Sequence, residues 1–195
     1  MLQVAPIVEG HGEVHAVPEL IRRIAANSAP GTPLQVLPAI RVSRNRVVKP
    51  NVLERYVDLA ARKSIPDGRI LLLLDADREC PMQLASRLLS RARRARSDRL
   101  ISVVIAKAEF ESWFLASASS IAGVRGISTR CEAPRDPEAI RDAKGWLTRQ
   151  MAPGRRYSPT VDQLDLTRCF DIDAARAAPS FDKFWRDVET LLASQ

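Results

Sequence analysis

The sequence predicts an α/β fold with a mainly parallel sheet of roughly four strands, flanked by helices and followed by a C-terminal helical extension. Ile70–Leu74 is a short, unbroken apolar run, typical of a strand buried on both faces of a parallel sheet. Similar runs alternate with helical patterns, which favours right-handed crossovers between parallel strands. After about residue 121, strand signals fade and prolines interrupt the helical patterns. We therefore expect a main domain over residues 1–120 and a helical extension, packed on it, over residues 121–195.

The first expected strand, Leu2–Val8, ends in the turn Glu9-Gly10-His11-Gly12-Glu13. Two glycines within three residues permit a tight turn and a close approach of the backbone. A helix follows, with Pro18 expected in its first turn, where the missing N–H costs little. The turn lacks the third glycine of the dinucleotide fingerprint, which argues against a dinucleotide cofactor.

Two histidines lie close to this turn. His11 and His15 are spaced i, i+4, which would allow both to hold a transition metal from one helix face. However, the chain has no other histidine, and catalytic zinc usually takes three protein ligands. We therefore favour two polar side chains at the mouth of a site over a zinc pair.

The other elements follow in chain order from their apolar spacing and the turn residues that bound them. In the main domain they are a strand over Gln35–Val42, a helix over Asn51–Lys63, the central strand after Pro66-Asp67-Gly68, a helix from Pro81 to about Ser97 with Ala85, Leu88, Leu89 and Ala92 buried, and a strand over Leu100–Ile105. In the extension they are helices over Pro137–Gln150 and Phe181–Leu192.

Two aspartates, Asp75 and Asp77, directly follow the central strand. Ligands of open parallel sheets sit beyond the carboxyl ends of the strands, and residues i and i+2 of an extended chain point to the same side. Two adjacent carboxylates repel each other unless a cation neutralises them, and oxygen ligands suit Mg²⁺ or Mn²⁺. The alternative is that Asp75 ends the strand and Asp77 caps the following helix.

Basic side chains give the chain a formal net charge of +7 and a pI of about 9.9. The last 41 residues hold six basic and seven acidic residues, so the first 154 residues carry an excess of +8. Such an excess suits nucleic acid as a partner, and a solvated arginine-rich surface is the alternative. The candidate nucleic-acid-binding residues are Arg44, Arg46, Arg91 and Arg94.

The sequence gives no sign of a membrane or of an oxidising compartment. No apolar run is long enough to cross a bilayer, and Met1-Leu2-Gln3 does not begin a signal peptide. The three cysteines are widely spaced and fit neither a disulfide framework nor a zinc pattern. We expect a cytoplasmic protein without a membrane partner, and a homodimer is one option for its assembly.

Carboxylates thus follow three of the predicted strands: Glu9, the pair Asp75 and Asp77, and the pair Glu109 and Glu111. This set resembles TOPRIM, the catalytic domain of topoisomerases, primases and OLD-type nucleases, in which a glutamate follows the first strand and Asp-x-Asp the third. In a doubly wound sheet with its switch point between those strands, the strand ends are neighbours. Adjacent strands lie about 4.8 Å apart, so the carboxylates could share a metal. The resemblance makes residues 1–120 the catalytic domain.

More narrowly, the chain resembles a family of TOPRIM-like proteins catalogued as a domain of unknown function. The resemblance rests on the order and spacing of short patches, namely Val8-Glu9-Gly10, Leu74-Asp75-Ala76-Asp77, Glu109-Phe110-Glu111-Ser112-Trp113, Lys144-Gly145-Trp146 and Pro179-Ser180-Phe181. Some relatives are nuclease effectors paired with an ATPase in anti-phage defence, which implies antiviral defence and an ATPase partner here. The chain itself has no Gly-x-x-x-x-Gly-Lys-Ser/Thr motif.

The resulting hypothesis is a Mg²⁺- or Mn²⁺-dependent nuclease that cleaves phosphodiester bonds of DNA or RNA. Glu9, Asp75 and Asp77 would hold the metal, and Glu111 with Glu109 would complete a second metal position or orient the first ligands. Lys144 would neutralise charge developing on the phosphate, and an ordinary surface lysine is the alternative reading.

The alternative hypothesis is a non-catalytic TOPRIM-like subunit that binds an ATPase partner or nucleic acid. The acid set argues against this role, because a non-catalytic subunit does not need to crowd like charges.

Overall fold

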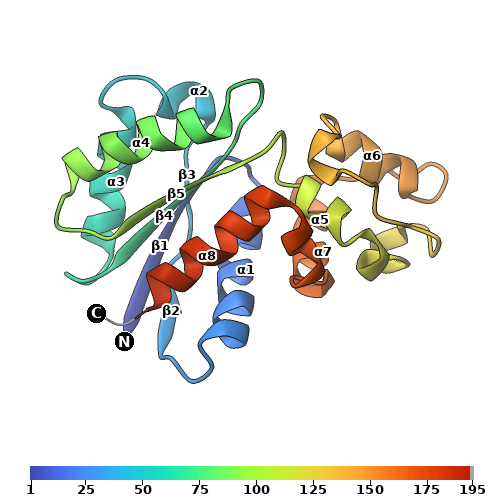
Figure 1. Cartoon of the computed structure of the whole chain (residues 1–195), viewed down its shortest axis with the longest axis horizontal. Helices are drawn as coiled ribbons and strands as arrows, with labels where there is room; N and C mark the ends of the chain where they lie inside the picture. Colours follow the sequence, from blue (N-terminus) through green and yellow to red (C-terminus); the bar gives the residue numbers. More distant parts are fainter. Residues whose placement is uncertain (194–195) are drawn as a thin grey trace.

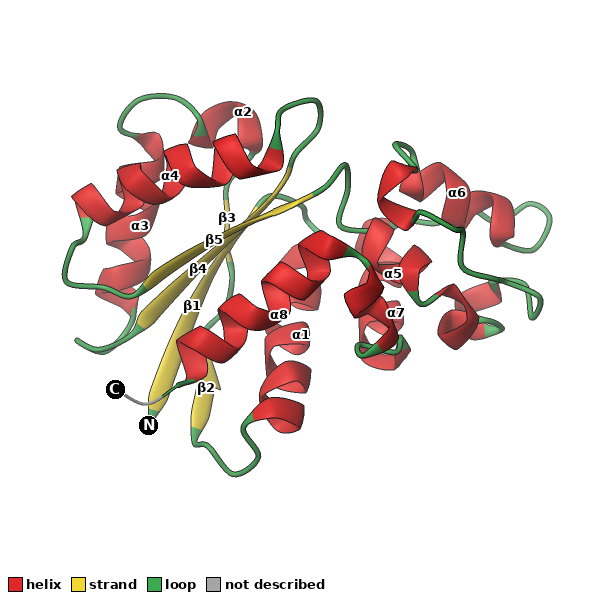
Figure 2. Ribbon diagram, viewed as in Figure 1, coloured by secondary structure: helices red, strands yellow, loops and turns green. Residues whose placement is uncertain are grey.

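The computed structural model describes residues 1–193, which leaves the last two residues of the expected helical extension outside the described part. The fold is α/β, as predicted, with a fully parallel sheet at its centre (Figure 2). Its five strands within residues 1–193 are β1 (Leu2–Val8), β2 (Leu34–Val36), β3 (Ile40–Arg41), β4 (Arg69–Asp75) and β5 (Ile101–Ala106). β1 pairs with β2 and β3 on one side and with β4 on the other, and β5 forms the far edge.

Helices cover both faces of the sheet (Figure 1). α1 (Glu13–Ser28) and α8 (Pro179–Leu192) pack on one face, and α3 (Val52–Lys63) and α4 (Pro81–Ala95) pack on the other. Alternate residues of β4 enter opposite layers: Leu71 and Leu73 join the core with α1 and α8, whereas Ile70, Leu72 and Leu74 join the core with α3 and α4. The prediction of a strand buried on both faces is therefore confirmed.

The strand expected over Gln35–Val42 is divided into β2 and β3, which raises the strand number from about four to five. Val4 of β1 pairs with Val36, and Ile7 pairs with Ile40. Between these two pairs the chain advances by three residues in β1 but by four residues in the edge segment. The extra residue falls in the interruption that contains Pro38, whose missing N–H cannot join a ladder.

Two helix boundaries also differ from the expectation. Pro18 lies inside α1, in its second turn rather than its first, because the helix begins at Glu13. The helix expected over Pro137–Gln150 is a short 3₁₀ turn, η3 (Pro137–Ala139), followed by α6 (Ala143–Gln150). Asp142 separates them, because its side chain accepts the N–H of Gly145 and starts a new helix.

In α4, the buried residues are Leu84, Leu88 and Ala92, whereas Ala85 and Leu89, which were expected in the stripe, are only half-buried. The helix ends at Ala95, two residues before the expected end.

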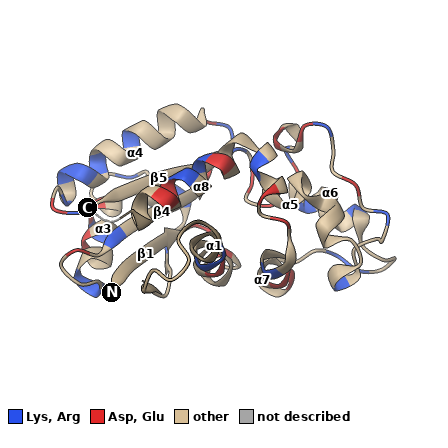
Figure 3. Ribbon diagram, turned by 60° about the horizontal axis from the view of Figure 1, so that its bottom comes forward, with Lys and Arg blue, Asp and Glu red and all other residues tan. Residues whose placement is uncertain are grey.

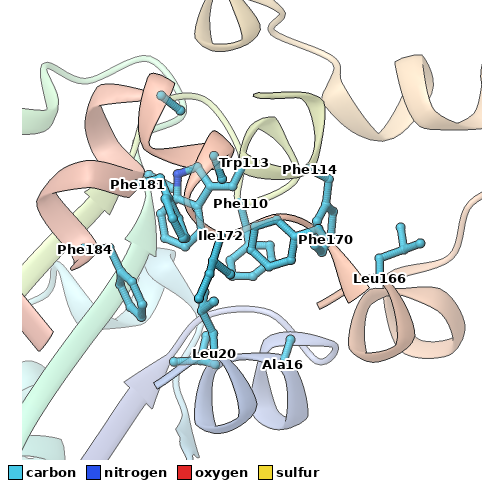
Figure 4. Close-up of a cluster of buried hydrophobic side chains, with 14 of the residues drawn as sticks. Ala16, Leu20, Phe110, Trp113, Phe114, Leu166, Phe170, Ile172, Phe181 and Phe184 are labelled. Atoms are coloured by element: carbon cyan, nitrogen blue, oxygen red, sulfur yellow. The ribbon is translucent and has the colours of Figure 1, made fainter. Parts of the chain in front are cut away.

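The helical extension contains one helix that the sequence did not predict, α7 (Pro159–Cys169). α5 (Ser112–Ala116) and η1 (Ala118–Ile121) lead into the extension. Its other elements are η2 (Val124–Gly126), η3, α6, η4 (Ala174–Ala177) and α8. Buried aromatic residues join the extension to the sheet: Trp113 lies 5.2 Å from Phe181 between ring centroids, and Phe114 lies 5.2 Å from Phe170 (Figure 4). α6 projects beyond the end of the sheet, and α8 returns across its face (Figure 1).

Among residues 1–193, no helix has the length and apolar character that crossing a membrane requires.

Candidate active site

The carboxyl ends of β1, β4 and β5 lie at one edge of the sheet. Val8 pairs with Leu73 and Asp75 pairs with Ala106, so the residues that follow these strands start from neighbouring positions. This arrangement confirms the predicted order of the three strand ends. The acidic residues that meet here, Glu9, Glu13, Asp75 and Glu111, are called the acid cluster below.

Glu13 is the member of the acid cluster that the sequence analysis did not identify. It opens α1, is 5% exposed, and accepts the N–H groups of Glu9 and Gly10, each at 3.1 Å. The glycine turn therefore folds back onto the carboxylate of the helix that follows it. Burial raises the pKa of Glu13 to about 7, the N–H of Gly10 opposes the rise, and the negative charge of Glu111 adds to it.

Asp75 ends β4 and is half-buried, and its Oδ1 accepts the N–H of Phe110 at 2.9 Å. Burial raises the pKa of Asp75 well above its usual range, and the charges of Glu13 and Glu111 raise it further. Lys144 acts in the opposite direction. These mutual effects show that acids from three separate segments share one electrostatic environment.

Glu9 contributes an oxygen without a partner. Its Oε2 is buried and forms no hydrogen bond with any described residue. Burial raises the pKa of Glu9, the backbone of Arg44 and of Asp75 lowers it, and the charge of Asp77 raises it. A buried carboxylate oxygen that no protein donor satisfies is free to bind a cation.

Glu111 is 1% exposed and lies on the side of the acid cluster nearest the extension. Its carboxylate accepts the hydroxyl of Tyr157 at 3.1 Å and pairs with Lys144 Nζ at 3.0 Å. Lys144 Nζ also pairs with Glu109 at 2.9 Å. Burial alone would lower the pKa of Lys144, but the charges of Glu111 and Asp75 outweigh it and raise the pKa. Lys144 is therefore a charged lysine held inside the site.

Asp77 lies at the outer rim. Its side chain is 66% exposed, its backbone is left-handed at φ 50°, and its Oδ2 pairs with Arg44 at 3.2 Å. Arg44 is buried and also donates to the carbonyl groups of Asp75 and Ala76, at 2.9 and 3.0 Å. Arg44 therefore fixes the end of β4, and its hydrogen bonds are used within the protein.

The four predicted nucleic-acid-binding arginines divide into two pairs. Arg91, like Arg44, is engaged internally, because it binds Glu54 at 2.8 Å and the carbonyl of Lys49 at 2.8 Å. Arg46 and Arg94 are exposed. Only the second pair keeps an accessible guanidinium for a phosphate.

Tyr157 and Gln163 are further residues that the sequence analysis did not identify. Gln163 is buried and lies 3.5 Å from the Glu111 carboxylate, on the side where Tyr157 binds. Both come from the segment around α7, which has no strand end to mark it. Glu13 had a visible signal, since it falls four residues after Glu9, but an acid in a first helical turn also suits the helix dipole.

The donor atoms of the acid cluster fit one class of metal. All are carboxylate oxygens, and the unpartnered Oε2 of Glu9 lies among them. Within residues 1–193, no group of three or more histidine, cysteine, aspartate or glutamate side chains is placed so that it could hold a metal ion. Mg²⁺ suits such a site, because it usually keeps several waters and binds through one or two carboxylates rather than an all-protein cage.

A family described as Domain of unknown function (DUF4276) matches residues 8–189. No curated protein and no solved structure matches the chain. Because the match covers nearly the whole chain, the chain belongs to the DUF4276 family, which confirms the expected resemblance to a family catalogued as a domain of unknown function.

Proposed function

We propose that this member of the DUF4276 family is a Mg²⁺- or Mn²⁺-dependent nuclease with a TOPRIM-like active site. The observation that carries the proposal is the charge imbalance of the acid cluster. Glu9, Glu13 and Asp75 converge at one sheet edge, and burial raises the pKa of each of them. The charge of Glu9 adds to the rise for Glu13, and the charges of Glu13 and Glu9 add to the rise for Asp75. None of the three forms an ion pair among residues 1–193. A divalent cation would remove this repulsion.

Each side chain then has a role. Glu9 and Asp75 would hold the metal, with Glu13 and Asp77 beside them. When bound, Mg²⁺ supplies Lewis acidity toward a phosphate oxygen. Lys144, already charged and 37% exposed, would stabilise negative charge that develops on the phosphate. Glu109 and Glu111 position Lys144 for this task.

The proposed substrate is DNA or RNA, in keeping with the basic excess of the first 154 residues. Because the chain resembles nuclease effectors, we extend the proposal to a role in antiviral defence, in the cytoplasm and with an ATPase partner.

The test combines cleavage with a metal titration of the melting temperature. Asp75→Asn should abolish Mg²⁺-dependent cleavage of DNA or RNA, because the amide keeps the shape but removes the charge. Without metal, the variant should melt at the wild-type temperature or slightly above it, since one of several repelling anions is gone. Mg²⁺ should stabilise the wild type but not Asp75→Asn, by about 2.7 kcal/mol at one hundred times the dissociation constant.

Asp67→Asn is the matched control, because Asp67 is exposed in the turn before β4, at the opposite end of that strand. It should keep both the cleavage and the metal-induced shift. If metal shifts none of the proteins and Asp75→Asn costs up to about 1 kcal/mol, as a lost cap does, the acids are scaffold. The protein is then the non-catalytic subunit of the alternative hypothesis.

A further inference from the structure

A groove of about 1180 Å³ lies beside the acid cluster. Its walls come from α2 (Arg44–Val47), from the loops after β4 and β5, and from the segment between η3 and α6. Asp77 and Glu109 form part of its lining, so the groove runs along the edge of the proposed active site. Charged residues of both signs lie on the loop between β5 and α5 (Figure 3).

The acidic residues of the groove already have partners within the protein. Asp77 and Glu79 pair with Arg44, and Glu109 pairs with Lys144. Glu138 is 4% exposed and accepts the N–H of Ser180 at 2.8 Å. Three of the four carboxylates are therefore engaged in ion pairs, and Glu138 is held by a backbone N–H alone.

Three basic residues of the groove remain available. Arg78, Lys107 and Arg141 are exposed, and their side chains form no ion pair or hydrogen bond with any residue from 1 to 193. They come from three different segments that meet only in the fold. Against these three unpaired cations, the lining holds one carboxylate, that of Glu138, which forms no ion pair within residues 1–193.

The backbone is unusual at two points of the same lining. Asp77 and Ala108 have left-handed φ angles of 50° and 65°, although neither is glycine. Each adjoins one of the free cations, Arg78 or Lys107. Such conformations cost about 1–3 kcal/mol and cluster at functional sites, where the surrounding structure maintains them.

Building on the proposed nuclease function, we propose that this groove binds the sugar-phosphate backbone of a single nucleic-acid strand and leads it to Asp75. Arg78, Lys107 and Arg141 contact its phosphates. The lining contains no aromatic side chain, so base stacking contributes nothing and binding tolerates any sequence. A groove with walls on several sides admits an extended strand, and its lining offers no long helix to enter a duplex groove.

The experiment measures binding of a fluorescein-labelled oligothymidylate, and of the same strand paired in a duplex, by anisotropy at several salt concentrations. All proteins carry Asp75→Asn and are measured in EDTA, so that cleavage does not interfere. Removing one cation, as in Arg78→Ala, Lys107→Ala or Arg141→Ala, should weaken binding and reduce the slope of log K against log salt by about 0.7. The matched controls are Arg93→Ala and Arg130→Ala, which remove exposed arginines outside the groove and should leave the slope unchanged.

Three results would overturn the inference: no binding of the strand, equal losses in the groove and control variants, or tighter binding of a duplex. The nuclease proposal fails separately. If only the groove variants lose affinity for the strand, but the wild type cleaves no nucleic acid with Mg²⁺ or Mn²⁺, strand binding in the groove is confirmed and the nuclease function is wrong. If the wild type cleaves nucleic acid, and Lys107→Ala and Arg141→Ala have the same KM as the wild type, the nuclease function is confirmed and strand binding in the groove is wrong.

Discussion

The acid cluster has two sides that differ in how their charge is balanced. On the side of the extension, Glu111 lies against Lys144, whose ammonium also binds Glu109. On the side of the sheet, Glu13 and Asp75 accept backbone N–H groups, whereas Oε2 of Glu9 accepts none from residues 1–193. None of these three acids forms an ion pair among the same residues. The extension thus supplies Lys144 as a cation for Glu111, whereas the negative charges of the acids at the sheet edge have no cation paired with them among residues 1–193.

This difference indicates where an external cation belongs. Buried carboxylates without a counter-ion are costly, and they either take up protons or bind a metal. The raised pKa values of Glu13 and Asp75 fit the first outcome in the absence of metal, and the unpartnered oxygen of Glu9 fits the second. The predictions below probe the two sides separately.

The largest effect is expected from pH on the unbalanced side. Glu13 has a folded pKa of about 7 against an ordinary value of 4.5, so the folded state binds more protons between these values. Stability should therefore be greatest below pH 4.5 as far as Glu13 is concerned. It should fall by up to roughly 3 kcal/mol as pH rises to 7, and change little above. Urea unfolding of wild type and Glu13→Gln across this range measures the effect.

Glu13→Gln should reduce the loss of stability between pH 4.5 and pH 7. The control Glu19→Gln, farther along α1, should leave this loss unchanged. Because Mg²⁺ competes with protons for the same carboxylates, the metal-induced rise in melting temperature should be larger at pH 8 than at pH 5.5. Equal slopes for wild type and Glu13→Gln would show that Glu13 is not one of the unbalanced acids of the sheet side.

A smaller loss is expected when the balanced side is deprived of its cation. Lys144→Met leaves Glu111 buried without its ion pair, which should cost about 2 kcal/mol after allowance for the partial exposure of Lys144. Lys183→Met, which breaks a surface pair with Asp187 at i, i+4, should cost less than about 0.5 kcal/mol. Urea unfolding at neutral pH compares the two.

Adding Glu111→Gln to Lys144→Met should recover part of the loss, because the amide removes the uncompensated charge. If Lys144→Met costs no more than Lys183→Met, the two sides of the acid cluster do not differ in the way described.

Much of the fold could be predicted from local patterns. The buried strands, the glycine turn and α8 follow from apolar spacing, which depends on neighbouring residues alone. α7 could not be predicted in this way, because its buried residues include Asp162, Gln163 and Thr167. Asp162 and Gln163 find their partners outside the helix: Arg125 and Arg155 pair with Asp162, and Gln163 lies beside Glu111.

The same contrast holds for the acid cluster. Glu9, Asp75 and Glu111 could be predicted because strand ends mark them, and parallel pairing brings those ends together. The burial of Arg44 could not be predicted, because nothing in the sequence around a basic residue shows that it will donate to the carbonyl groups at the end of a distant strand. Lys144 was expected near the site, but its two carboxylate partners are known only from the fold.

The smallest effect concerns the hydroxyl of Tyr157, which belongs to the balanced side. It donates to Glu111 at 3.1 Å, and burial followed by the charge of Glu111 raises the pKa of Tyr157 well above its usual range. Tyr157→Phe removes this donor but leaves Lys144 in place, so the loss should be about 1 kcal/mol by urea unfolding. Tyr56→Phe, at a half-buried tyrosine whose hydroxyl bonds to no residue from 1 to 193, should change stability by less than about 0.5 kcal/mol. A loss in Tyr157→Phe as large as that in Lys144→Met would mean that the hydroxyl, as much as the ammonium, stabilises the charge of Glu111. Hydrogen bonding, and not the ion pair alone, would then offset the charge of Glu111 on the extension side.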